Sequence, residues 1–218
     1  MYIRLSLTVV FFLSFFMGTS QQINHANKII PESIEEEVLQ ALVHFPELYD
    51  TAIEFKFKDR IKKSTMMAQP KFSGFFKSRK KREYVILISK KIQMEDQEYT
   101  IHDFPRNVLI GWLGHELGHI MDYQDRSNMG MILFGIKYLF SSKSIRNVEL
   151  TADSYAIAHG MGAYILATKN FILDHSHLSE KYKDRIRRLY ISPEEVMELI
   201  EENEKNLTDE LEAIEAES

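Results

Sequence analysis

GWLGHELGHIMDY, residues 111–123, contains His115, Glu116 and His119 in the spacing H-E-x-x-H. Residues four apart lie on one face of an α-helix, so both imidazoles can bind one metal ion with Glu116 beside it. Apolar residues occupy nearly the whole circumference of this segment, which is typical of a buried helix. Zn²⁺ binds neutral imidazole, and a catalytic zinc site keeps one position for a water molecule. The stretch therefore predicts a zinc site with Glu116 as general base.

A third protein ligand is needed, because two histidines and a water leave tetrahedral zinc one ligand short. Glu149 is the best candidate, since it lies four residues before Asp153 and shares a helical face with it. Asp153 is then predicted to accept a hydrogen bond from the far ring nitrogen of a zinc-bound histidine and to orient that ligand. Asp125 is the alternative, at the position of the third ligand in metzincin zinc proteases. Asp122, however, stands where that pattern has glycine.

The combined pattern resembles the signature of the gluzincins, the thermolysin-like and membrane-peptidase-like zinc proteases, which is HExxH followed by E-x-x-[AS]-D. The chain matches it at His115, Glu116, His119, Glu149, Ala152 and Asp153. The resemblance covers roughly residues 53–153 and implies an α+β, zincin-like fold. Such a fold has a small upper sheet of about three to four strands, the HExxH helix, and a helical lower lobe that carries the glutamate helix. It also implies a zinc peptidase with one Zn²⁺ per chain and a peptide or protein substrate.

The resemblance also implies a hydrogen-bond donor for the oxyanion of the reaction. In membrane-peptidase-like gluzincins this donor is a histidine after the glutamate helix, with an arginine following it, and His177 with Arg185 looks similar. The spacing is longer by about two residues, and Leu178 replaces the usual proline. His177 is therefore the catalytic candidate beside Glu116, and a water-exposed loop histidine is the alternative interpretation. The competitors for the role are His175, Tyr155 and Tyr182.

The first 20 residues have the layout of a secretory signal peptide. Arg4 supplies the positive charge, an apolar run follows, and small residues precede a cleavage site after Ser20. We therefore expect an extracytoplasmic protein, secreted or periplasmic. The alternative is an uncleaved N-terminal membrane anchor, although the run is short for a membrane span.

Composition narrows the class of protein further. The chain has 27 Lys and Arg against 32 Asp and Glu, so nothing indicates a nucleic-acid partner. It has no cysteine, so no disulfides can form and stability must come from a packed core. The oligomeric state is open. The expected organisation is a signal peptide over 1–20, one metallopeptidase domain over 21–205 with lobes at about 31–125 and 126–205, and an acidic tail over 206–218.

Local patterns predict the remaining elements. Strands are expected at 53–58 and 84–89, with a weaker strand inside 65–76, a short one at 98–102, and irregular chain over 21–30. Helices are expected from an N-cap at Ser33, over the glutamate segment to about 159, over 163–173 and 182–189, and from an N-cap at Ser192 into a frayed end. The basic run 77–82 indicates a solvated loop, with an acidic substrate or anionic lipid as alternative partner.

The segment 129–140 is the most apolar part of the chain after the leader. At twelve residues it is too short to span a bilayer. A core or lid helix is the favoured interpretation, and peripheral contact with a membrane surface is the alternative.

Two other functions remain open at this point. One is a zinc hydrolase that acts on something other than peptides. The other is a catalytically weak zinc-binding protein that serves as a binding or maturation factor in the cell envelope. Glu116 argues against the second, because binding zinc does not require that carboxylate.

Overall fold

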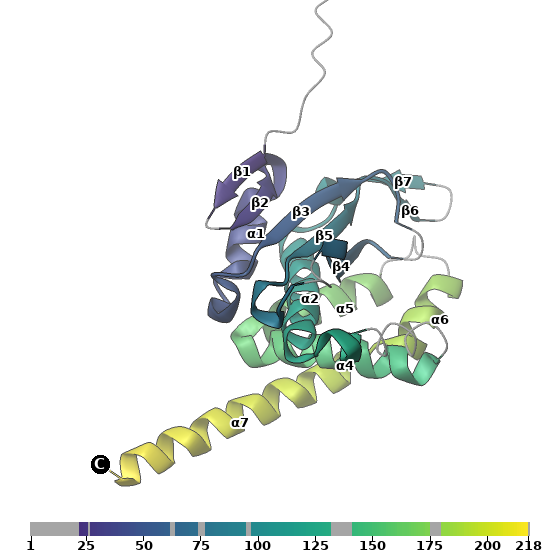
Figure 1. The fold of residues 1–218 in the computed structure, drawn as a ribbon. Coiled ribbons are helices and arrows are strands. Elements are labelled where there is room, and N and C mark those ends of the chain that lie inside the picture. Colours follow the sequence, from purple (N-terminus) through teal and green to yellow (C-terminus); the bar gives the residue numbers. More distant parts are fainter. Residues whose placement is uncertain are drawn as a thin grey trace, which may run out of the picture.

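A computed structural model describes residues 22–25, 27–61, 64–73, 77–94, 97–131, 141–174 and 180–217. In this part of the chain a small sheet lies against a group of helices, and the last helix extends away from the body (Figure 1). The architecture is mixed α and β with mostly helical content, as the sequence predicted.

The main sheet has five strands in the order β1-β2-β3-β5-β4. Strands β2, β3 and β5 are parallel, whereas β1 and β4 run antiparallel to their neighbours. A second sheet contains β6 and β7, which pair antiparallel. The strands span Gln22–His25, Lys28–Pro31, Ile53–Lys58, Met66–Pro70, Tyr84–Ser89, Ile92–Met94 and Gln97–Tyr99 for β1 to β7.

The expectation of three to four strands, with irregular chain before residue 31, was wrong. Asn27 has φ 69°, a left-handed conformation that asparagine tolerates, and it turns the chain from β1 into β2. Lys28 is 4% exposed, and its ammonium donates to the carbonyl oxygens of Leu48, Tyr49 and Thr51 at 2.8–2.9 Å. A polar residue can therefore lie in a buried strand here, because the fold supplies three acceptors from another segment.

Strand β4 forms one edge of the main sheet. Ser89 donates to the Thr65 carbonyl and Lys71 donates to the Glu83 carbonyl, so the odd-numbered residues of β4 bond to β5. The even-numbered residues direct their backbone groups to the free edge. Pro70 is one of these even positions, so its missing N–H removes no bond from the sheet, as is usual for proline in strands.

One hydrophobic core joins the sheet to the helices. It combines inward side chains of β3 and β5, such as Phe55 and Ile86, with Leu113 and Leu117 of α2, all of them fully buried. Helix α2 contacts α1, β4, α4 and α5, which makes it the centre of the fold. The predicted buried helix around the H-E-x-x-H pattern is thus confirmed.

The described residues include six α-helices, with the bounds α1 Glu35–Leu42, α2 Arg106–Asp125, α4 Ser142–Ala156, α5 Gly162–Asp174, α6 Glu180–Leu189 and α7 Pro193–Glu217. Ser33 does not cap α1, because a 3₁₀ turn over Glu32–Ile34 leads into it. Helix α4 ends in a π-helical turn over Ile157–Met161. Gly160 in that turn has φ 77°, a conformation that glycine adopts readily, and the break predicted near residue 159 is confirmed.

Helix α7 begins with the predicted cap. Ser192 donates its N–H to the Glu195 carboxylate at 2.7 Å, and Glu195 donates its N–H to the Ser192 hydroxyl at 3.2 Å. The helix then continues to Glu217, so the acidic residues expected to form a frayed tail are helical.

Two arginines of the basic run 77–82 hold the end of α2. Arg82 is 2% exposed and donates to the carbonyl oxygens of Tyr123 at 2.7 Å and Arg126 at 3.1 Å. Arg79 donates to the Asp125 carbonyl at 3.3 Å. Cations at a helix C-terminus satisfy free carbonyl groups and complement the helix dipole. This part of the run is therefore a structural cap rather than a solvated loop.

Some predictions lie outside the described residues. They are the signal peptide over 1–20, most of the apolar segment 129–140, and the loop with His175 and His177. Within the described part of the chain, no helix is both long enough and apolar enough to cross a membrane.

Candidate metal centre

Helix α2 carries His115, Glu116 and His119 inside the fold. Glu116 and His119 are 6% and 7% exposed. Edge strand β4 lies against this helix on one side, and α4 and α5 lie on the other. The apolar residues that surround the H-E-x-x-H pattern bury the helix, and this burial removes the polar side chains from bulk water.

Helix α4 brings Glu149 and Asp153 to the same place. These carboxylates are 3% and 0% exposed. Gly118 permits the close approach of α4, because a Cβ at that position would lie 2.2 Å from the carbonyl oxygen of Ala152. The glycine beside the predicted ligands is therefore needed for the contact between the two helices that carry the site.

Three potential metal ligands converge there. The distance from Glu149 Oε2 to His115 Nε2 is 3.0 Å, and to His119 Nε2 it is 3.6 Å. Ligand atoms from these residues all lie within 4.8 Å of one another. Two ligand atoms bound to a tetrahedral zinc at about 2.05 Å would be about 3.4 Å apart, so the observed oxygen–nitrogen distances suit such an ion. The three residues could hold a metal ion.

Asp153 is hydrogen-bonded to His115, as the sequence predicted for an orienting carboxylate. Its Oδ1 lies 2.7 Å from His115 Nδ1, which leaves His115 Nε2 facing Glu149. His119 differs, because its buried Nδ1 has no hydrogen-bond partner among the described residues. The aspartate therefore orients one histidine of the pair and not the other.

Lys169 on α5 was missed by the sequence analysis. It is 5% exposed, and its ammonium donates to Asp153 Oδ2 at 2.7 Å. The same nitrogen lies 4.8 Å from the centre of the Tyr190 ring, which itself is 6.0 Å from the His115 ring. The sequence did contain a signal for this residue: Lys169 is the one lysine in the apolar segment 162–174, and a charge on a buried helix requires a partner.

Charges in the metal-free cluster are strongly coupled. Burial alone would lower the pKa of His115, but the charge and hydrogen bond of Asp153, together with Glu149, raise this pKa to about 10. Burial alone would raise the pKa of Glu149, but the two histidines hold it well below its usual value. The two carboxylates therefore favour a proton on His115 at neutral pH.

Glu116 occupies a separate position beside these ligands. Its Oε2 accepts a hydrogen bond from the backbone N–H of Ala68 on β4 at 2.5 Å. Burial raises the pKa of this carboxyl, and the nearby histidine charges oppose the rise only in part. A carboxylate with a raised pKa is a better proton acceptor than an exposed one.

Asp125, the alternative third ligand, is absent from the group of converging atoms. Its side chain is exposed and accepts a hydrogen bond from the Tyr155 hydroxyl at 2.7 Å. This bond, with burial, raises the pKa of Tyr155 to about 12. The tyrosine hydroxyl considered as an oxyanion donor is thus engaged with Asp125.

No protein-family model, curated protein or solved structure matches the chain. The centre is therefore defined by its own geometry: two imidazole nitrogens and one carboxylate that converge, and a second buried carboxylate next to them.

Proposed function

We propose that the protein is a zinc-dependent peptidase of the gluzincin type. The observation that carries this proposal is the convergence of His115, His119 and Glu149 next to a carboxylate that is not needed as a ligand, Glu116. Imidazole nitrogens with one carboxylate suit Zn²⁺, whereas Mg²⁺ and Ca²⁺ prefer oxygen ligands. One zinc ion per chain and a zincin-like arrangement of the α+β fold belong to the same proposal.

A zinc ion bound there would polarise a peptide carbonyl and lower the pKa of a water molecule. Glu116 would accept the proton of that water and then deliver it to the leaving amine. Its raised pKa supports the first step, because burial makes the carboxylate a better proton acceptor. Asp153 would hold His115 in the tautomer that turns Nε2 toward the metal.

Edge strand β4 supports a polypeptide substrate. Ala68 on this strand donates its N–H to Glu116 and accepts from the Tyr123 hydroxyl, so the outer edge of the sheet borders the candidate centre, and a substrate would use the other backbone groups of this edge. An extended substrate could pair with such an edge through its main chain, which binds peptides with little demand on their sequence. Two parts of this proposal rest on the sequence alone. They are export through a signal peptide at residues 1–20 and an oxyanion donor at His177.

The test compares the wild type with Glu116→Gln. This variant keeps the size of the side chain and the zinc ligands but removes the proton acceptor. Hydrolysis of an unfolded protein or a peptide library should fall by at least about a hundredfold, since general-base catalysis contributes roughly 10²–10⁴. Zinc content, measured on both proteins, should stay equal.

Glu32→Gln is the matched control, because Glu32 is an exposed carboxylate far from α2 in the sequence. It should hydrolyse the library at the wild-type rate. If Glu116→Gln and the wild type show the same hydrolysis, or if neither cleaves any peptide with zinc bound, the metal is structural and the enzyme proposal fails.

A further inference from the structure

The last part of α7, residues 201–217, projects away from the body of the molecule in Figure 1. We call this part the arm. Its apolar side chains Leu207, Leu211 and Ile214 are 52%, 62% and 65% exposed. Spacings of four and three residues place them on one face of the helix. The arm therefore presents an apolar stripe that nothing in the described part of the chain covers.

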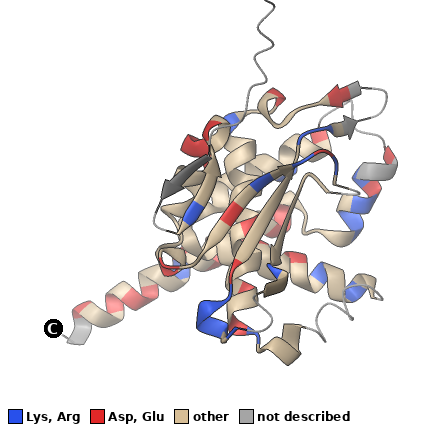
Figure 2. Cartoon of the chain, turned by 45° about the horizontal axis from the view of Figure 1, so that its top comes forward, with Lys and Arg blue, Asp and Glu red and all other residues tan. Residues whose placement is uncertain are grey.

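Acidic residues surround this stripe, as Figure 2 shows along the projecting helix. The arm contains a single basic residue, Lys205. Two arms could not pair well with each other, because like charges would face like charges along the whole contact. The surface that suits the arm is apolar in its centre and basic around it. The acids are Glu201, Glu202, Glu204, Asp209, Glu210, Glu212, Glu215 and Glu217.

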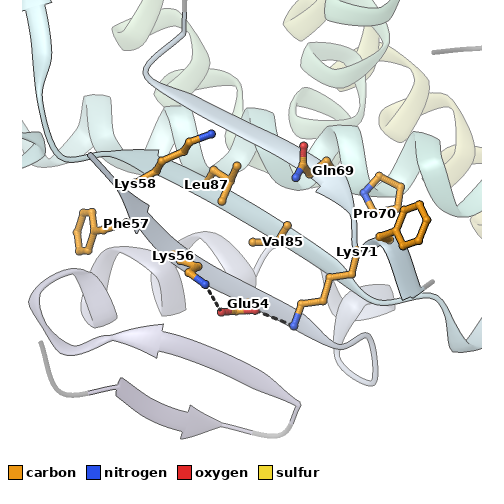
Figure 3. A pocket seen from close by; sticks show the side chains of 10 residues that line it. Glu54, Lys56, Phe57, Lys58, Gln69, Pro70, Lys71, Val85 and Leu87 are labelled. Atoms are coloured by element: carbon orange, nitrogen blue, oxygen red, sulfur yellow. Dashed lines mark ion pairs between the residues drawn. The ribbon is translucent and has the colours of Figure 1, made fainter. Parts of the chain in front are cut away.

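The outer face of the main sheet has this character. A groove of about 510 Å³ lies there over β3, β5 and β4, on the opposite side of the sheet from the core (Figure 3). Phe57, Val85 and Leu87 supply apolar side chains to it, and Phe72 at its end is 79% exposed. Val85 is only 7% exposed, so the exposed apolar surface of the groove comes from Phe72 and in part from Leu87 and Phe57.

Lysines give the groove its charge. Lys56, Lys58 and Lys71 line it together with one acid, Glu54. Glu54 lies 2.7 Å from the Lys71 ammonium and 3.8 Å from that of Lys56. Three positive charges against one negative charge leave the groove basic, so it attracts an acidic partner.

The dimensions of the two surfaces agree. Val85 and Leu87 point to the same face of β5 about 6.7 Å apart, because they are two residues apart in a strand. Leu207 and Leu211 are separated by about 6 Å along the helix axis, because they are four residues apart. An arm that lies along β5 can therefore place successive apolar side chains beside successive apolar side chains of the strand.

We propose that the arm of one molecule docks into the sheet groove of a second copy of this chain. Leu207, Leu211 and Ile214 then cover the apolar floor, and the flanking acids face the lysines. Reciprocal exchange of two arms closes a pair, and one-way exchange builds a longer assembly. Neither surface includes the metal ligands, but the groove includes Gln69, Pro70 and Lys71 at the end of β4, the strand proposed to pair with a substrate.

The test measures molar mass by light scattering and sedimentation across the micromolar range. The wild type should associate, and added salt should weaken the association by screening the charges. A variant that ends at Glu202 should be monomeric. Lys56→Glu/Lys58→Glu/Lys71→Glu should associate at least tenfold more weakly, whereas the matched triple reversal Lys80→Glu/Lys81→Glu/Lys143→Glu of exposed lysines outside the groove should behave as wild type.

Mixing the truncated variant with the groove variant gives the sharpest result. One supplies the only intact groove and the other the only intact arm, so a heterodimer should form at concentrations where each protein alone is monomeric. Circular dichroism and zinc content confirm that each variant is folded. A monomeric wild type, undiminished association of the truncated variant, or no heterodimer in the mixture would overturn the proposal.

Discussion

Helices α4 and α7 both carry acidic residues four positions apart, with opposite consequences. Glu149 and Asp153 on α4 are buried, and each contacts a histidine at 3.0 Å or less. Glu198 and Glu202 on α7 are exposed. The sequence spacing is the same, and only the neighbours differ. A pair of acids on a helix becomes a candidate site only when another element supplies partners and excludes water.

The largest expected effect comes from Lys169 on α5, which bonds to the buried Asp153 of α4. Its ammonium is one of two partners of the buried Asp153, so Lys169→Met should leave that carboxylate with His115 alone and with Oδ2 unpaired in the core. Removing one partner of a buried ion pair costs about 3–5 kcal/mol of the free energy of unfolding. Urea unfolding of the metal-free protein measures this loss.

The double variant Lys169→Met/Asp153→Leu separates stability from metal binding. It should recover most of the stability, because no lone charge remains, yet bind zinc more weakly since His115 has lost its orienting partner. If the double variant is as unstable as Lys169→Met, charge balance is not the role of the lysine.

Glu149→Ala should lower zinc affinity by more than about a hundredfold, since a direct ligand should exceed the roughly 10–100-fold effect of an outer partner. Asp125→Ala is its control and should bind zinc as the wild type does, because Asp125 lies outside the converging group. Competition with a chelator gives both affinities. The reverse ranking would assign the third ligand to Asp125, as in metzincins.

Asp153→Asn should reduce zinc affinity by roughly 10–100-fold, less than loss of a ligand. The amide retains the shape of the side chain but cannot accept from His115 and from Lys169 as a carboxylate does. The same chelator competition measures the effect. An unchanged affinity would mean that the aspartate serves the fold alone.

Zinc binding to the metal-free protein should release about one proton at neutral pH. The pKa of His115, about 10 when folded, lies above its unfolded value of about 6.5. This histidine therefore stabilises the metal-free fold fully below about pH 6.5, and the contribution disappears as the pH rises through about 10. Calorimetric titration in two buffers of different ionisation enthalpy counts the protons. A value near zero would show that His115 is already neutral.

Glu198→Gln should change the free energy of unfolding by less than about 0.5 kcal/mol, because an exposed carboxylate on α7 keeps its water. Thermal unfolding of Glu198→Gln and of Asp153→Asn compares the loss of stability on α7 with that on α4. A large loss for Glu198→Gln would reveal a contact on α7 that burial does not indicate.

Sequence patterns anticipated the elements whose signal is local. The apolar circumference of α2, the alternation in β3 and the cap at Ser192 each depend on residues within a few positions, and each appears in the structure. The strands β1 and β2 pair with each other locally, but β2 joins the sheet through the distant strand β3, and both strands were missed. Lys28 shows the cause, since its three acceptors come from residues 48–51.

The sequence by itself determined that His115, Glu116 and His119 share one region of a buried helix, because helical periodicity fixes which residues are neighbours. It also gave Glu149 and Asp153 a common face. Only the tertiary structure decided that α4 approaches α2 at Gly118, that Asp153 contacts His115 and not His119, and that Lys169 balances its charge. Contacts between helices depend on how side chains pack across long sequence separations, and no local pattern encodes that packing.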